Sequence, residues 1–265
     1  MSRARSQTTV AVASILAIYI VILYGPVVLL PLFSFNDNLY TVFPLSGFTL
    51  KWYRQLGDDT SLLGSLWASL KVAVAASLIG TALGFMAAKA MTHHLVPFRK
   101  LFYSFLLLPL IVPTIVKGAS LLSFFRQYLD LPLSLWIVGA AHTMMTIPFA
   151  MLVLIARLES FDRNLEEASS DLGMSMWQTL RRITLPLAMP GIISSLLLCF
   201  IVSFDEFLLA FFLSGNEPTL PIYMFGLLRF PDSVPSLLAL GSCILVVSVI
   251  LITTTEALRL RREPR

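Results

Sequence analysis

The sequence predicts an all-α integral membrane protein with six transmembrane helices. Hydrophobic residues make up 57% of the 265 residues, the mean hydropathy is +0.84, and only 13% of the residues are charged. Soluble domains average about 25% charged residues. Several apolar runs also exceed the roughly 18 residues that a helix needs to cross a bilayer. The composition therefore indicates one transmembrane domain covering residues 1–265.

Six apolar runs separated by polar loops form the predicted spans. The first run is longer than the apolar core of about 7–15 residues in a secretory signal, so we expect it to remain as an uncleaved span. Pro109 and Pro113 should break the third run, because proline removes a helical hydrogen bond. The core spans lie within residues 62–257. The six runs cover about residues 10–33, 62–88, 101–125, 133–156, 187–213 and 237–257.

The distribution of basic residues predicts the topology. Six spans put both termini on one side of the membrane, and the loops and tails on that side hold thirteen Lys and Arg residues. The opposite side holds four, and Lys71 and Lys117 fall inside spans. Cytoplasmic loops carry the excess of Lys and Arg, so both termini and residues 157–186 are predicted to be cytoplasmic. The net charge of +4 is thus explained by topology, and nucleic acid is not an expected partner.

Residues 159–186 form the longest polar interruption between apolar runs. Asn164 followed by Glu167 has the spacing of a capping box that opens a helix. Gly173 is suited to the left-handed conformation that ends a helix. We therefore expect a short helix between Asn164 and Gly173.

A second short helix is predicted immediately afterwards. Ser175 and Gln178 repeat the capping-box spacing, and Pro186 should mark the change to the next apolar run. An alternative is a helix that rests on lipid, but such helices are usually rich in Lys and Arg. Residues 164–173 contain three acids and no base. This pattern favours docking to a protein.

The same segment carries a motif at fixed spacing, which consists of Glu167, Ala168, Ser169, Gly173, Ile183, Leu185 and Pro186. It resembles the Glu-Ala-Ala, Gly, Ile-x-Leu-Pro signature of permease subunits of ATP-binding-cassette (ABC) importers, and one serine departs from the signature by a hydroxyl group. Further along, Ser203 to Glu206, Leu213 to Gly215 and Thr219 to Pro221 resemble the second permease of spermidine/putrescine-type importers.

The resemblance implies a type I ABC importer permease fold and a set of partners. The expected partners are a cytoplasmic ATPase dimer that docks on residues 159–186, a second homologous permease, and a periplasmic or surface solute-binding protein. ATP and Mg would be bound by the ATPase, so no cofactor and no enzymatic activity are expected in this chain. A Walker-type Gly-rich loop is absent from the sequence. The implied location is the bacterial inner membrane.

Asp205 and Glu206 are the candidate solute-binding acids. Carboxylates within a span are expensive and usually face a cavity or a partner. Helical spacing puts Glu206 on a stripe of small, partly polar residues, with Asp205 about 100° around the helix. We expect the stripe to face the translocation pathway, although pairing with a lysine of another span is an alternative. The stripe consists of Ser195, Cys199, Ser203, Glu206 and Ala210.

Lys71 and Lys117 leave the identity of the solute open. A pathway for a polycation should be acidic, and that favours a polyamine such as spermidine or putrescine. The two lysines would then neutralise the acids or extend to the membrane surface. They would instead bind a carboxylate or phosphonate if the solute were zwitterionic, such as an amino-acid derivative, opine or aminophosphonate. A secondary carrier is a further alternative, but the inverted repeat and coupling-ion residues typical of one are not evident.

His142 is the only histidine within a predicted span. An intramembrane histidine can relay protons. Since no acid lies one turn away on the same span, we expect a packed structural histidine that shares hydrogen bonds with Thr143 and Thr146. Cys199 and Cys243 are expected to be free thiols.

Overall fold

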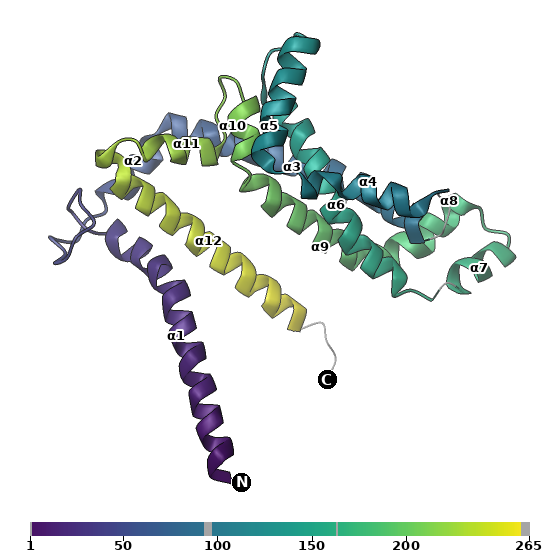
Figure 1. Cartoon of the computed structure of the whole chain (residues 1–265), viewed down its shortest axis with the longest axis horizontal. Coiled ribbons are helices and arrows are strands. Elements are labelled where there is room, and N and C mark those ends of the chain that lie inside the picture. Colours follow the sequence, from purple (N-terminus) through teal and green to yellow (C-terminus); the bar gives the residue numbers. More distant parts are fainter. Residues whose placement is uncertain (1, 93–96, 163, 261–265) are drawn as a thin grey trace. The chain divides into compact units, whose positions relative to one another are not determined.

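A computed structural model describes residues 2–92, 97–162 and 164–260. The basic tail at 261–265, which contributes to the predicted topology, lies outside the described residues. In the described residues the secondary structure is helical, apart from an isolated bridge between Asn36 and Phe48 (Figure 1). The elements are α1 (Ser2–Ser34), α2 (Lys51–Asp58), α3 (Thr60–Thr92), α4 (Arg99–Ile111), α5 (Thr114–Ser123), η1 (Phe124–Tyr128), α6 (Leu135–Glu159), α7 (Asn164–Asp171), α8 (Met176–Thr179), η2 (Leu180–Thr184), α9 (Leu185–Phe204), α10 (Leu208–Leu213), α11 (Leu220–Leu227), η3 (Pro231–Ser233) and α12 (Val234–Leu260).

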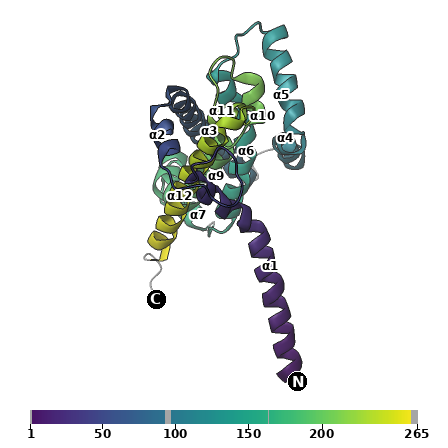
Figure 2. The same cartoon turned by 90° about the vertical axis from the view of Figure 1, so that its left-hand side faces the viewer.

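The predicted all-α membrane fold is confirmed. Among the described residues, five helices are long and apolar enough to cross a membrane, or up to six if the bent pair α4 and α5 forms one span. The two helices of this pair meet at 95° (Figure 2). The predicted break is confirmed at Pro113, whereas Pro109 lies inside α4. Proline explains the break because Pro113 cannot donate to the carbonyl of Pro109.

The predicted fifth span differs from the observed one. We expected a continuous run over residues 187–213, but α9 ends at Phe204 and a separate helix, α10, begins at Leu208. The break coincides with the carboxylate of Glu206, which accepts a hydrogen bond from the backbone N–H of Leu209 at 3.0 Å. A side-chain acceptor for a free N–H stabilises a new helix start.

The chain divides into two compact units. One unit combines residues 1–62 with 224–265, in which α1 and α2 both pack against α12. The side chain of Trp52 on α2 is buried and donates to the backbone carbonyl of Asn36 at 2.8 Å. Lys51 and Asp37 form an exposed ion pair at 2.5 Å. These contacts hold α2 against the loop that follows the first span.

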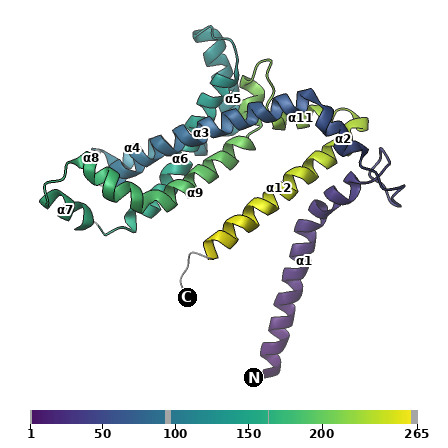
Figure 3. The same cartoon turned by 180° about the vertical axis from the view of Figure 1, so that it is seen from behind.

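The other unit, residues 63–223, contains the core formed by α3, α6 and α9 (Figure 3). A Cβ atom at Gly84 of α3 would lie 2.4 Å from the Cβ of Ala150 on α6, so glycine allows these helices to pack closely. Thr81 of α3 and Ser195 of α9 share a hydrogen bond at 3.2 Å. The three helices therefore pack as one block.

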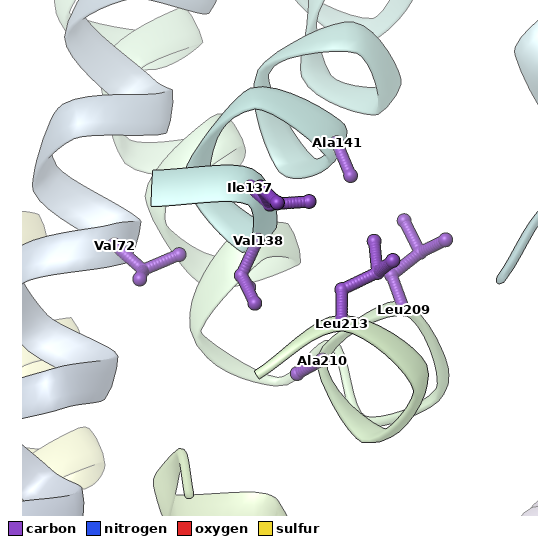
Figure 4. Packing of buried hydrophobic residues seen from close by; sticks show 7 residues of the cluster. All are labelled: Val72, Ile137, Val138, Ala141, Leu209, Ala210 and Leu213. Carbon is purple, nitrogen blue, oxygen red and sulfur yellow. The ribbon is translucent and has the colours of Figure 1, made fainter. Parts of the chain in front are cut away.

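A hydrophobic cluster joins this block to α10. Figure 4 shows that its members come from α3, α6 and α10 and face one another. Gly118 of α5 also meets α10, because an added Cβ would lie 2.4 Å from the ring of Phe212. The cluster consists of Val72, Ile137, Val138, Ala141, Leu209, Ala210 and Leu213.

Candidate functional site

Local hydrogen bonds stabilise both ends of helix α7. At its start, the N–H of Asn164 is accepted by the side chain of Asp162 at 3.0 Å. The predicted Asn164 capping box is therefore wrong, because Asn164 is already the first helical residue and Asp162 supplies the acceptor. At its end, Gly173 has φ +80°, as predicted. Gly173 donates to the Ser170 carbonyl at 2.9 Å and Met174 to the Ser169 carbonyl at 3.1 Å, which together form a Schellman motif.

The second helix of the segment continues into the fifth span. The predicted capping box of Ser175 and Gln178 is confirmed, with hydrogen bonds of 2.8 and 3.3 Å. The predicted end at Pro186 is wrong, because helical turns continue from Met176 to Phe204. A wide π-helical turn, η2, precedes Pro186 and accommodates the proline within the helix. The second short helix is thus the beginning of the fifth membrane-crossing helix.

The signature residues divide into exposed and buried positions. Glu167 and Ala168 are exposed on α7. Ser169, the residue that departs from the signature, is buried, and its hydroxyl lies 2.8 Å from that of Thr179. This contact links α7 to α8. Ile183 and Leu185 are half-buried, and Pro186 is exposed.

Three large apolar side chains are exposed around Gly173. Leu172, Met176 and Trp177 are 83%, 79% and 66% exposed, respectively. We call these three residues, together with exposed Glu167 and Ala168 of α7, the docking surface. Large apolar groups that remain exposed in a polar segment are typical of a protein interface.

A second acid, Glu166, faces the interior instead. Its carboxylate accepts a short hydrogen bond from the buried hydroxyl of Thr184 and lies 3.5 Å from the ammonium of Lys89 on α3. Lys89 also donates to the Thr184 hydroxyl at 3.4 Å. No motif in the sequence marks these three residues as partners. Lys89 is 77 residues from Glu166 and 95 residues from Thr184, and Glu166 is 18 residues from Thr184. Helical spacing predicts contacts within one or two turns and so cannot predict these.

The predicted stripe on the fifth span packs inside the chain. Ser195 contacts Thr81, and the Ser203 hydroxyl lies 2.9 Å from Nδ1 of His142. Ser195, Cys199 and Ser203 are all buried. In the described residues α3 and α6 cover these side chains, which favours a packing role for this part of the stripe, and its predicted place in a pathway stays a prediction.

His142 is packed, as predicted, with 2% of its surface exposed. Its partner differs from the prediction: Ser203 bonds Nδ1, whereas Thr143 and Thr146 donate to backbone carbonyls. No described residue forms a hydrogen bond with its buried Nε2. The sequence could not reveal this pair, since His142 and Ser203 are 61 residues apart.

The two acids differ in their surroundings. Asp205 is the exposed residue that ends α9, while Glu206 is half-buried and caps α10. The structure describes no ion pair between either acid and Lys71 or Lys117. Glu206 therefore has a structural role in addition to the predicted pathway role.

The two intramembrane lysines are also in different positions. Lys71 is exposed on α3. Lys117 is buried, and its ammonium donates to the backbone carbonyl of Pro109 at 2.7 Å. This is the carbonyl that Pro113 leaves without its helical donor, so Lys117 stabilises the 95° bend. This contact favours a structural role for Lys117 over one in binding a solute.

The described residues contain no group of three or more His, Cys, Asp or Glu side chains that could hold a metal ion. Cys199 and Cys243 are free thiols, as predicted.

Known proteins are similar to this chain over most of its length. Residues 80–263 match the family described as "Binding-protein-dependent transport system inner membrane component". The chain is 31% identical to the spermidine/putrescine transport system permease protein PotC of Escherichia coli K12, over 88% of each chain. It is 33% identical to the putrescine transport system permease protein PotI of the same strain, over 84% of this chain and 81% of PotI. It is 29% identical to PhnV of Salmonella paratyphi A, named as a 2-aminoethylphosphonate transport system permease protein, over 95% of this chain and 91% of PhnV.

The fold is also similar to a solved structure. A chain of a bacterial ABC transporter involved in the import of alginate matches with a TM-score of 0.77 at 17% identity, over 98% of both chains. At this identity the likeness concerns the fold alone. It confirms the expected ABC importer permease architecture.

Proposed function

The chain belongs to the family of binding-protein-dependent transport system inner membrane components, and from this premise we propose that it is the membrane subunit of an ATP-driven importer for a polyamine. The observation that carries the solute class is the 31% identity to the spermidine/putrescine permease PotC over 88% of both chains. In this proposal the chain forms half of the pathway beside a second permease, and a solute-binding protein delivers the polyamine.

The docking surface supports a mechanical link to a soluble ATPase. ATP is hydrolysed on that partner, and its closure moves the docked segment. Exposed Leu172, Met176 and Trp177 supply apolar area for a groove, and exposed Glu167 supplies a charge for a basic residue at its rim. Apolar anchors surrounded by polar contacts carry most of the binding energy at protein interfaces. The segment lies in the cytoplasm in this proposal, as the distribution of Lys and Arg predicts.

Exposed Asp205 and half-buried Glu206 support an amine-bearing solute. Attraction between a carboxylate and a cation is several times stronger in a partly dry pathway than in bulk water. Two adjacent acids therefore favour a polyvalent cation over a neutral solute.

The proposal is tested with the purified complex in proteoliposomes. Spermidine and putrescine, each presented with the solute-binding protein, should stimulate ATP hydrolysis and enter the vesicles only when the ATPase subunit is present. Uptake that is independent of ATP and the ATPase would instead indicate a secondary carrier. A matched control uses the same complex with the solute-binding protein omitted.

An aminophosphonate is the second candidate, because the chain is 29% identical to PhnV over 95% of its length. Exposed Lys71 would then be available to the phosphonate group. Competition separates the candidates: excess 2-aminoethylphosphonate should leave spermidine uptake unchanged if the solute is a polyamine. Strong competition, together with direct uptake of labelled 2-aminoethylphosphonate, would support the second candidate.

A further inference from the structure

Three polar side chains join α7 to the ends of two core helices. Lys89 lies in the last turn of α3, Thr184 lies directly before α9, and Glu166 lies in the first turn of α7. The Lys89 ammonium lies 3.5 Å from the Glu166 carboxylate and 3.4 Å from the Thr184 hydroxyl, and Thr184 donates to Glu166. Each of the three residues thus contacts both of the others. An acid in the first turn is also favoured by the helix dipole.

The burial of this triad distinguishes it from an ordinary surface ion pair. The side chains of Lys89 and Glu166 are 20% and 23% exposed, and Thr184 is fully buried. The exposed pair of Lys51 and Asp37, at 45% and 52%, serves as an internal comparison. Exposed ion pairs contribute little because solvent screens them, whereas pairs that are removed from water interact more strongly. Breaking the buried pair therefore has the larger effect.

The helices that the triad holds are themselves firmly connected. α3 and α9 share the hydrogen bond between Thr81 and Ser195, and Gly84 brings α3 against α6. A displacement applied to Lys89 and Thr184 therefore acts on a packed block rather than on one isolated helix. Close-packed interiors transmit such a displacement because they have low compressibility.

We propose that Lys89, Glu166 and Thr184 form a latch that fixes α7 to the ends of α3 and α9, so that movement of the docked segment reaches the spans. In this proposal the closing ATPase pushes on the docking surface, which consists of Glu167, Ala168 and the apolar residues around Gly173. Glu166, Lys89 and Thr184 transmit this displacement from α7 to α3 and α9, and they are therefore positioning residues. This inference rests on the proposed function, because it assigns the path by which an ATPase moves this chain.

The test measures solute uptake per ATP hydrolysed in proteoliposomes that contain the complete transporter. Lys89→Met and Glu166→Gln should each lower this ratio about tenfold, while the ATPase still co-purifies with the chain. The double variant should be no worse than either single variant, because residues in one network are not additive. The exchanged pair, Lys89→Glu with Glu166→Lys, should recover at least half of the ratio.

The matched controls are Lys100→Met and Glu159→Gln, two exposed charges outside the triad, and both should keep the wild-type ratio. Unchanged ratios in the Lys89 and Glu166 variants of a working transporter would overturn the latch alone. So would an exchanged pair that is as defective as the single variants, since a latch requires the two charges to act on each other. A wild-type complex without solute-stimulated ATP hydrolysis would overturn the proposed function, and the latch with it.

Discussion

The docking surface and the end of α9 at residues 203–206 both combine polar and apolar groups, but the chain uses their side chains differently. Glu167, Leu172 and Trp177 remain exposed. Ser203 is buried against His142, and Glu206 already accepts a backbone N–H. A group that is bonded within the chain is less available to a partner or solute. The comparison thus separates a surface that is open to a partner from a region in which the fold occupies Ser203 and Glu206 and leaves Asp205 exposed.

The largest expected effect is at Gly173. Gly173→Pro should abolish solute uptake while the chain remains in the membrane, because proline fixes φ near −65° and lacks an N–H. The native residue needs φ +80° and donates to the Ser170 carbonyl. Uptake and solute-stimulated ATP hydrolysis in proteoliposomes measure the loss. Gly173→Asn is the control, since asparagine tolerates the left-handed conformation. Normal uptake by Gly173→Pro would mean that coupling between the ATPase and the spans does not require the left-handed backbone conformation of Gly173.

The helix ends within residues 159–186 could be predicted from the sequence because they depend on residues that are close in the sequence. Gly173 and the Ser175–Gln178 box depend on residues within one helical turn, and both were confirmed. Asp162 accepts the N–H of Asn164, and α7 begins at Asn164 itself, one residue earlier than the predicted capping box implies. The predicted boundaries of the fifth span, at Pro186 and Leu213, were wrong because a π-helical turn and a side-chain cap override the apolar pattern.

The interior contacts could not be predicted in the same way. Lys117 satisfies the carbonyl of Pro109, and His142 bonds Ser203, through packing that no single-sequence pattern encodes. Helical spacing correctly grouped Ser195, Cys199 and Ser203 on one face, but spacing alone cannot tell whether other helices of the same chain cover that face.

The second prediction concerns charge at the end of α9. If the solute is a polyamine, the double variant Asp205→Asn, Glu206→Gln should lower uptake about tenfold, as expected for about 1.4 kcal/mol of lost attraction. Glutamine retains an oxygen for the N–H of Leu209, so the loss would report charge rather than capping. Lys71→Met should be neutral or mildly beneficial. Unchanged uptake by the double variant at normal membrane levels would remove both acids from the solute path.

The third prediction concerns the buried hydrogen bond between Ser203 and His142. Ser203→Ala leaves Nδ1 of His142 without its partner, and an unsatisfied buried polar group costs about 1–3 kcal/mol. The Tm of the purified chain in detergent should therefore fall by several degrees. Ser194→Ala, at an exposed serine on the same helix, is the control and should change Tm by less. An unchanged Tm combined with lost uptake would instead favour a direct role for Ser203 in the pathway.

The smallest effect is expected at the one position where the motif departs from its family signature. Ser169→Ala introduces the signature residue and removes the hydroxyl contact with Thr179. Thr179 keeps its hydrogen bond to the Ser175 carbonyl at 3.2 Å, so no buried donor loses every acceptor. A hydrogen bond of this kind contributes about 0.5–1.5 kcal/mol net, and the helices remain joined through the Schellman turn at Gly173. Uptake should therefore change by less than about twofold. A severe loss with Ser169→Ala, but not with Thr179→Val, would show that the Ser169 hydroxyl itself is needed, through its 3.2 Å contact with the Met174 sulfur.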